Sequence, residues 1–461
     1  MIKFGTDGWR AILGEEFNDE NVRRVTLAIG KYVLDNFGYE KQILIGYDPR
    51  NKADCYAKMS AEILADKGFI VTLSNKVVPT PVLAYNAQFR NACAIMFTAS
   101  HNPPEYLGMK FIPDYAGPAT DDITDEIVSD LDIDFEAAEN KMNVNCADFS
   151  LAYFEHLKKI IDFEKIKTLK SKIIFDGLYS ASIGYFDEIL KAHNINFETM
   201  HMEHDIDFGG LMPDPKPKYL KELMNDIGNK FDSIGVANDG DADRFGVVDE
   251  NGTFVPADVV IAIILKYLIK KGYKGSVVKT VGSSILIDEV AKKLDVKVIE
   301  TAVGFKHVGE AMRNHKVVIG GEESGGLSIQ GHIPEKDGIL ANLLLLEAVA
   351  DSEMTLETLH QKIYEFAGCR FHTYRRDFKK SDSSEIQKVL DYFKDLKNIG
   401  KFEVTDTDLK DGVKLMLGER AKILVRPSGT EPLLRVYFEA DKKDKLNAIE
   451  EATDKLVEEI S

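Results

Sequence analysis

The 461-residue chain has few cysteines, no long apolar run and no excess of positive charge. Its four cysteines are scattered without a C-x-x-C pair, which predicts inert thiols in a reducing compartment. The most apolar segments, 259–265 and 339–346, are far shorter than the roughly 20 residues that span a bilayer, and residues 1–5 begin no signal peptide. A net charge of −18 disfavours nucleic acid and anionic membranes as partners. The sequence therefore predicts a cytoplasmic protein with neither kind of partner.

What the chain does contain is one local pattern in three copies, which begin at Ile43, Lys172 and Ser276. Each copy is a continuously apolar run of β-forming residues, a turn rich in Gly, Asp or Ser, and an amphipathic helical segment. Such alternation is typical of parallel βαβ units. From about Cys369 the pattern changes to strands and helices of a small α+β unit. The predicted fold is α/β, with three related domains of mixed or parallel βαβ units and a C-terminal α+β domain.

The length of the chain exceeds what one hydrophobic core accommodates, so several domains are expected. Candidate boundaries lie in the acidic stretch 132–145, near residues 251–258 and near Ala367. The predicted domains are residues 1–145, 146–252, 253–367 and 368–461.

A polar turn at residues 97–104 is the first segment that carries chemistry. It follows the apolar run 94–97 and places Ser100 beside His101, with two prolines after them. A rigid turn at the end of a strand presents a side chain outward, which suits a nucleophile. Lys110, just past Gly108, is close enough in sequence for its ammonium to fold back over the serine. The alternative is a helix-capping pair in an ordinary loop.

The second segment, 238–244, carries Asp239, Asp241 and Asp243 directly after an apolar run. Open α/β sheets bind ligands at this end of their strands. Alternate carboxylates in a tight turn converge on a hard cation, which favours Mg²⁺ over zinc. An EF-hand is excluded because Arg244 stands where that loop needs glycine. A solvated acidic turn is the alternative, but like charges 4 Å apart repel by about 4 kcal/mol at an effective dielectric near 20.

Two further segments combine glycines with polar side chains. Residues 319–326 pair glycines with Glu322 and Ser324, which suit the hydroxyls of a sugar, and Lys336 follows nearby. The alternative is a glycine-rich turn. Residues 426–432, with Arg435 after them, predict an anion-binding turn, and the alternative is a proline-bounded surface turn. Its candidate ligands are Arg426, Ser428, Gly429 and Thr430.

Taken in order, these segments resemble those of the α-D-phosphohexomutases, the phosphoglucomutase and phosphomannomutase family. The resemblance covers essentially the whole chain. It implies four domains around a central cleft, each contributing one loop. The motifs that carry it are Gly-Thr-Asp-Gly-Trp-Arg at 5–10, Thr-Ala-Ser-His-Asn-Pro at 98–103, Asp-Gly-Asp-Ala-Asp-Arg at 239–244, Gly-Glu-Glu-Ser at 321–324 and Arg-Pro-Ser-Gly-Thr-Glu-Pro at 426–432.

The resemblance also implies roles for individual residues. Ser100 would be the phosphorylated nucleophile, and an oxygen of its phosphoryl group would bind one Mg²⁺ together with Asp239, Asp241 and Asp243. The residues expected to line the transfer site are Arg10, His101, Lys110 and Arg244. The residues expected to bind the sugar and its other phosphate are Glu322, Ser324, Lys336, Arg426, Ser428, Gly429, Thr430 and Arg435. The chain departs from the family at Leu107-Gly108, where Asn-Gly is usual, so we expect the turn that positions Lys110 to differ.

The function implied is interconversion of glucose 1-phosphate and glucose 6-phosphate through phosphoserine and a glucose 1,6-bisphosphate intermediate that also acts as activator. Lys110 and His101 are both candidates for the general base. The leading alternatives are a phosphomannomutase and an enzyme of dual specificity. A phosphoglucosamine mutase ranks lower, because that branch usually has Ser-Ala-Ser-His where this chain has Thr-Ala-Ser-His at 98–101. A phosphosugar sensor without turnover and a phosphatase are further alternatives. The expected partners are hexose phosphates, and the chain is expected to be a monomer or a homodimer.

Overall fold

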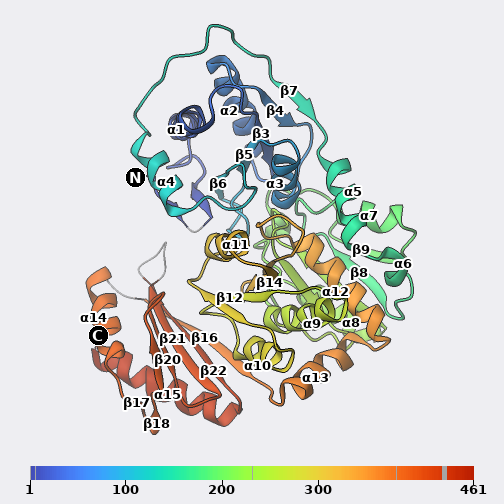
Figure 1. Ribbon diagram of the computed structural model, residues 1–461, viewed down its shortest axis with the longest axis vertical. Coiled ribbons are helices and arrows are strands. Elements are labelled where there is room, and N and C mark those ends of the chain that lie inside the picture. The colour runs from blue at the N-terminus through green and yellow to red at the C-terminus, as the bar shows by residue number, and fades with distance from the viewer. Residues whose placement is uncertain (1, 6, 231, 380–381, 428–432, 461) are drawn as a thin grey trace.

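The structure is a computed structural model that describes residues 2–5, 7–230, 232–379, 382–427 and 433–460. The chain forms four units, each built on its own sheet (Figure 1). In Figure 1 the first unit, in blue and cyan, lies at the top, the second, in green, at the right, the third in the centre, and the fourth, in orange and red, at the lower left. The predicted fold class is confirmed: three α/β units precede an α+β unit.

The first unit contains a seven-stranded sheet of order β1-β2-β6-β5-β3-β4-β7. Strands β4, β3 and β5 are parallel, and β6 runs antiparallel beside β5. Its strands are β1 (Phe4–Gly5), β2 (Gly8–Ile12), β3 (Ile43–Tyr47), β4 (Val71–Ser74), β5 (Cys93–Phe97), β6 (Tyr106–Ile112) and β7 (Asn145–Ala147). Its helices are α1 (Asp19–Phe37), α2 (Ala53–Lys67), α3 (Thr80–Phe89) and α4 (Asp121–Ser129).

The second and third units share one topology, with sheet orders β9-β8-β10-β11 and β13-β12-β14-β15. The second comprises α5 (Ser150–Ile160), α6 (Phe163–Ile166), β8 (Lys172–Asp176), α7 (Phe186–Ala192), β9 (Phe197–Met200), the 3₁₀ turn η1 (Phe208–Gly210), α8 (Lys221–Lys230), β10 (Ser233–Asn238) and β11 (Phe245–Val248). The third comprises α9 (Ala257–Lys270), β12 (Ser276–Thr280), α10 (Ile285–Lys293), β13 (Val298–Thr301), α11 (Phe305–Asn314), β14 (Val317–Glu322), β15 (Gly326–Ile329), α12 (Gly338–Ser352) and α13 (Leu356–Ala367).

The repeated pattern seen in the sequence is thus a repeated strand order. In each of the first three units a parallel strand passes through one loop into an antiparallel neighbour: β5 into β6, β10 into β11 and β14 into β15. The serine segment and the aspartate segment are two of these loops, and the third loop follows Glu322, the last residue of β14. Equivalent topology therefore brings each chemical segment to the equivalent edge of its sheet.

The fourth unit is a five-stranded antiparallel sheet of order β16-β22-β21-β20-β19, packed on two helices. Its elements are β16 (His372–Lys379), α14 (Ser383–Lys394), β17 (Asn398–Ile399), β18 (Phe402–Glu403), β19 (Asp406–Asp408), β20 (Val413–Met416), β21 (Ala421–Pro427), β22 (Leu433–Ala440) and α15 (Lys443–Ile460). The predicted boundaries between the units stay predictions.

The two most apolar segments of the sequence lie in the buried helices α9 and α12. Helix α12 contacts β10 and β11 of the second sheet and β15 of the third, so its apolar surface is covered on several sides. Among the residues that the structure describes, no helix is both long and apolar enough to cross a membrane.

The fourth unit is joined to the third by buried polar groups. Glu439 of β22 accepts hydrogen bonds from the Ser284 hydroxyl and the Ile285 N–H at the start of α10, where a helix dipole favours a carboxylate. Lys422 of β21 donates to the carbonyls of Val281 and Ser283. Asp258 is buried at the same interface.

We predict that Asp258 makes stability pH-dependent. Burial, with the nearby Glu323 and Glu439 carboxylates, raises the pKa of Asp258 from its usual value near 3.8 to about 7. Between these values the folded chain keeps a proton that the unfolded chain releases, so stability falls as the pH rises. Between pH 5 and pH 8 the wild type should lose about 2 kcal/mol more than Asp258→Asn. Calorimetric unfolding at both pH values measures this, and parallel pH profiles for the two proteins would contradict it.

Candidate active site

Ser100 is buried at the junction of the first and second units, in a loop made rigid by side chains of its own unit. Its backbone adopts the left-handed conformation (φ +51°), which a serine holds only when neighbouring groups enforce it. The Thr98 hydroxyl accepts from the Ser100 N–H at 2.8 Å and donates to Asp48 at 2.6 Å. The buried Arg50 guanidinium donates to the Ser100 carbonyl at 2.6 Å and to the Asn102 carbonyl at 2.7 Å.

The aspartate loop packs directly on the serine loop. A Cβ at Gly240 would lie 2.5 Å from the Ser100 carbonyl oxygen, so only glycine permits this approach. The Ser100 hydroxyl donates to Asp239 Oδ2 at 2.7 Å. The nucleophile predicted from one unit therefore touches the acidic turn predicted from another.

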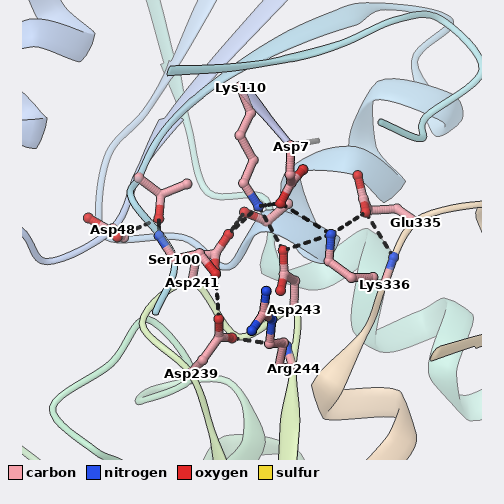
Figure 2. Close-up of polar contacts among 12 residues, drawn as sticks. Asp7, Asp48, Ser100, Lys110, Asp239, Asp241, Asp243, Arg244, Glu335 and Lys336 are labelled. Atoms are coloured by element: carbon pink, nitrogen blue, oxygen red, sulfur yellow. Dashed lines mark hydrogen bonds and ion pairs between the residues drawn. The ribbon is translucent and has the colours of Figure 1, made fainter. Parts of the chain in front are cut away.

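Asp239, Asp241 and Asp243 are buried, with carboxylate oxygens that lie within 4.8 Å of one another. Lys110 Nζ lies 2.8 Å from Asp241, 2.7 Å from Asp243 and 2.8 Å from Asp7 (Figure 2). One ammonium group from β6 thus forms ion pairs with three carboxylates that come from two units.

The buried charges shift one another's pKa values. Burial and the neighbouring Asp243 and Asp241 carboxylates raise the pKa of Asp239 well above its usual range. Burial also opposes ionisation of Asp241, but the Lys110 ammonium outweighs it and lowers the pKa of Asp241 to about 2. Burial alone would lower the pKa of Lys110, yet Asp241, Asp243 and Asp7 hold it well above its usual range. Lys110 therefore keeps its proton in this arrangement.

The donor set of the triad fits a divalent cation. Asp241 Oδ1 and Asp243 Oδ1 are buried without a hydrogen-bond partner. A buried carboxylate oxygen without a donor is costly, which indicates a site that a cation completes. Three carboxylates provide the hard oxygen ligands that Mg²⁺ prefers.

Arg244, His101 and Arg10 surround this cluster. The Arg244 N–H donates to Asp239 Oδ1 at 2.9 Å, and Arg10 donates to Asn102 of the serine loop at 2.8 Å. Burial and the positive charges of Arg244 and Arg10 lower the pKa of His101 well below its usual value. His101 Nδ1 lies 3.5 Å from the Ser100 hydroxyl, so a neutral imidazole is near the nucleophile.

The glycine-rich loop of the third unit lies against the aspartate loop, since the Phe245 N–H donates to the Gly325 carbonyl at 3.0 Å. Ser324 donates its hydroxyl hydrogen to Glu322 Oε1, while Glu322 Oε2 is buried without a hydrogen-bond partner. Lys336 lies in the acidic cluster itself, with its Nζ 3.2 Å from Asp7 and 3.3 Å from Asp243.

In the fourth unit Arg426 and Arg435 are cross-strand partners of β21 and β22. Arg426 Nε forms an ion pair with Asp411 at 3.1 Å, and Arg435 Nε is buried without a hydrogen-bond partner. Two guanidinium groups side by side are suited to an anion. The predicted ligands Ser428, Gly429 and Thr430 lie outside the described residues.

The expectation of a turn at Leu107-Gly108 is wrong. Both residues lie in β6, where Gly108 pairs with Arg10 and Leu107 pairs with Ala11. Leu107 is fully buried, and a Cβ at Gly108 would lie 2.6 Å from the carbonyls of Trp9 and Thr98. Lys110 therefore reaches the aspartates from a regular strand, and a buried leucine at position 107 is compatible with that strand.

Four further residues of the cluster were not singled out from the sequence: Asp7, Asp48, Arg50 and Glu335. Asp7 lies in the motif at 5–10, between β1 and β2, and Asp48 directly follows β3. Their positions at the ends of strands could have marked both as candidates. Arg50 binds backbone carbonyls, which no side-chain pattern reveals. Glu335 is buried beside Lys336. Burial raises the pKa of Glu335 to about 8, although the Lys336 ammonium acts in the opposite direction.

A serine loop, an aspartate loop and a Glu-Ser loop at equivalent edges of three matched α/β units, with paired arginines on a fourth, define an α-D-phosphohexomutase. Models of the phosphoglucomutase/phosphomannomutase family match the chain throughout. They match as α/β/α domain I at residues 1–137, domain II at 151–252, domain III at 256–366 and the C-terminal domain at 378–456.

Known proteins agree with this assignment over whole chains. The chain is 31% identical to a phosphoglucosamine mutase of Methanocaldococcus jannaschii and 28% identical to a phosphoglucomutase/phosphomannomutase of Thermococcus kodakarensis, with 99% of this chain and 98% of each relative covered. A Thermus thermophilus protein assigned as a phosphomannomutase matches at TM-score 0.88 and 32% identity, with 99% of both chains covered.

A more distant structure shares the fold alone. An Aspergillus fumigatus N-acetylphosphoglucosamine mutase, solved with GlcNAc-6P and magnesium, matches at TM-score 0.61 and 14% identity, with 99% of this chain and 95% of that chain covered. The chain belongs to the phosphoglucomutase/phosphomannomutase family, whose members are mutases of the isomerase class.

Proposed function

We propose that the chain moves a phosphoryl group between positions 1 and 6 of a hexose phosphate, with Ser100 as the carrier. The contact between the Ser100 hydroxyl and Asp239, beside the buried triad, is the observation that supports this proposal most directly. Phosphorylated Ser100 gives its phosphoryl group to the free hydroxyl of the sugar. The phosphorus–oxygen bond to serine breaks as the bond to the sugar forms. The bisphosphate then turns, and its other phosphate returns to Ser100.

We assign the triad of Asp239, Asp241 and Asp243 as the ligands of one Mg²⁺, with an oxygen of phosphorylated Ser100. When bound, the cation supplies positive charge for the transferring phosphoryl group. Arg244 lies beside the triad, with its backbone N–H on Asp239, and its guanidinium adds positive charge that would stabilise the charge developing during in-line transfer.

The attacking hydroxyl must lose its proton to a nearby group. His101 is the better acceptor, because its Nδ1 lies 3.5 Å from the Ser100 hydroxyl and burial with the Arg244 and Arg10 charges lowers the pKa of its imidazole, whereas Lys110 is ion-paired with Asp7, which is outside the proposed metal ligands. We therefore propose His101 as the base and Lys110 as a cation that orients the transferring group with Arg10.

The remaining loops are proposed to bind the sugar and the phosphate that is not reacting. Glu322 Oε2, buried without a partner, is free to accept from a sugar hydroxyl, and Ser324 is hydrogen-bonded beside it. Because the two phosphates exchange places, the second site must accept either orientation of the intermediate. The residues proposed for it are Arg426, Ser428, Gly429, Thr430 and Arg435, while Lys336, within 3.3 Å of Asp243, is proposed to bind the substrate at the transfer site.

For the sugar we propose glucosamine first and glucose second. The sequence favoured glucose. Of the two relatives named above, however, the phosphoglucosamine mutase is the more similar, at 31% identity against 28% for the phosphoglucomutase/phosphomannomutase. A phosphomannomutase is supported by the Thermus neighbour. The corresponding activator is the 1,6-bisphosphate of the preferred sugar.

The test supplies glucosamine 1-phosphate, glucose 1-phosphate and mannose 1-phosphate in turn, with Mg²⁺ and the matching 1,6-bisphosphate. We expect kcat/KM for glucosamine 1-phosphate to exceed the others by at least about tenfold, equal to about 1.4 kcal/mol in transition-state binding. A preference for glucose or mannose would overturn the choice of sugar. Binding without turnover would indicate a sensor, and release of inorganic phosphate at the rate of isomer formation would indicate a phosphatase.

A further inference from the structure

A chain of hydrogen bonds joins the second unit to the segment that carries Lys336. His156 Nε2 on α5 lies 2.9 Å from His332 Nδ1, and His332 Nε2 lies 3.0 Å from Asp337 Oδ2. Tyr153, also on α5, donates to the same Asp337 oxygen at 2.8 Å. The other oxygen, Asp337 Oδ1, accepts from the Leu340 N–H at 2.8 Å and caps α12.

These partners determine where each proton lies. The Asp337 carboxylate accepts from three donors, so His332 must carry its hydrogen on Nε2. His332 Nδ1 is then an acceptor, and His156 must donate from Nε2. With one hydrogen on each ring, this pattern leaves one tautomer for each histidine. The side chains of His332 and Asp337 are fully buried, so water cannot replace a lost donor.

Aromatic packing fixes the outer end of this chain. The His156 ring stacks on Tyr85 of α3 with centroids 4.3 Å apart, and it lies edge to edge with the nearly coplanar His332 ring at an interplanar angle of 19°. Elements of the first, second and third units therefore meet at His156.

The inner end of the chain leads to the active site. Two hydrogen bonds attach segment 333–336 to β15. At one end the Ser328 hydroxyl donates to the Ile333 carbonyl at 2.5 Å, and at the other the Asp337 N–H donates to the Leu327 carbonyl at 2.9 Å. The next residue, Gly338, donates to Ala242 of the aspartate loop at 3.1 Å. Lys336 reaches Asp7 and Asp243 from within this segment.

We propose that His156 is a positioning residue for the active site: through His332 and Asp337 it fixes the segment that delivers Lys336 to the acidic cluster. This inference rests on the proposed function, since Lys336 is taken as part of the phosphotransfer site. Without the His156 donor, His332 Nδ1 is a buried acceptor with no hydrogen, so His332 is expected to take its other tautomer or rotate, and its bond to Asp337 is lost.

The test compares three variants. His156→Phe keeps a flat ring on Tyr85 but removes the donor, and we expect kcat/KM to fall about tenfold, chiefly through kcat, because a displaced Lys336 misaligns the reacting groups. His156→Gln supplies an amide N–H, and we expect most of the activity to return. The control is His193→Phe, because His193 stacks on Phe163 at 3.7 Å in the same unit and belongs to no such chain of hydrogen bonds. It should match the wild type.

A second measurement needs no variant. In the wild type labelled with ¹⁵N-histidine, we expect NMR to show His156 and His332 as neutral rings with hydrogen on Nε2. Hydrogen on Nδ1 of His332, or equal activity of the wild type and His156→Phe, would overturn the inference. An inactive wild type with both expected tautomers would instead contradict the proposed function and leave the hydrogen-bond chain standing.

Discussion

Ser100→Ala is expected to lose at least about 10⁴-fold in mutase activity, because the variant has no oxygen to carry the phosphoryl group. The purified wild type should contain a species heavier by one phosphoryl group, and this species should be absent from the variant. The structure allows the substitution itself with little disturbance. Ser100 donates one side-chain hydrogen bond to Asp239, and the other oxygen of Asp239 keeps its hydrogen bond from the Arg244 backbone N–H. Activity and intact mass are measured on the same preparations.

Ser60→Ala is the matched control for this experiment. Ser60 is equally buried in the first unit, where its hydroxyl lies 2.7 Å from that of Thr26 between α1 and α2. Its loss should cost about 1 kcal/mol of stability and leave turnover and phosphorylation unchanged. Retained phosphorylation in Ser100→Ala would show that another residue carries the group. Equal loss of activity in both variants would point to damage to the fold instead.

The architecture was predictable because the repeat is encoded locally. Continuously apolar strands followed by amphipathic helices specify parallel units, and the structure has three with one strand order. The chemical loops were visible for a related reason. Each lies at the end of an apolar strand, so its polar residues stand out in the sequence: Asp239 follows β10 directly, and Glu322 is the last residue of β14.

The contacts between the units were not predictable from local patterns. Lys336 and Asp7 touch although 329 residues separate them, and His156 meets His332 across 176 residues. Such pairs depend on how whole sheets are placed, which hydrophobic periodicity does not encode. Arg50 was missed for another reason, since it binds main-chain carbonyls that every sequence has.

The prediction about Leu107-Gly108 failed because it treated one position in isolation. The Asn-Gly pair that is usual in the family is typical of a turn. Its replacement by Leu107-Gly108 therefore led us to expect a turn of different conformation. In the structure the position is an inner strand, flanked by β2 and β5, where a buried leucine is favoured by packing and glycine by close backbone contact. Tertiary context decided the conformation, as it does for most strand residues.

Asp241→Asn tests the cation site, and we expect it to lose about 10³-fold in activity and to bind Mg²⁺ more weakly. The lowered pKa of Asp241, about 2, means that the substitution removes a full negative charge at any working pH. The asparagine retains an oxygen that can accept the hydrogen bond from the Thr80 hydroxyl, and this contact should preserve the conformation of the loop. Isothermal titration with MgCl₂ measures affinity independently of turnover. Raising Mg²⁺ should restore part of the activity, because the two other aspartates remain.

Asp187→Asn separates this charge effect from a general cost of removing a buried carboxylate. Asp187 is also buried in the second unit, where it accepts from the Gly184 N–H at 2.7 Å and pairs with Lys191, whose side chain is about half exposed. It should change stability while leaving Mg²⁺ affinity and the Mg²⁺ dependence of turnover as in the wild type. If Asp241→Asn and the wild type bound Mg²⁺ equally, the unpaired oxygens of Asp241 and Asp243 would need another occupant. The Lys110 ammonium contacts the other oxygen, Oδ2, of both residues, so the triad would then serve to hold that lysine and not a metal.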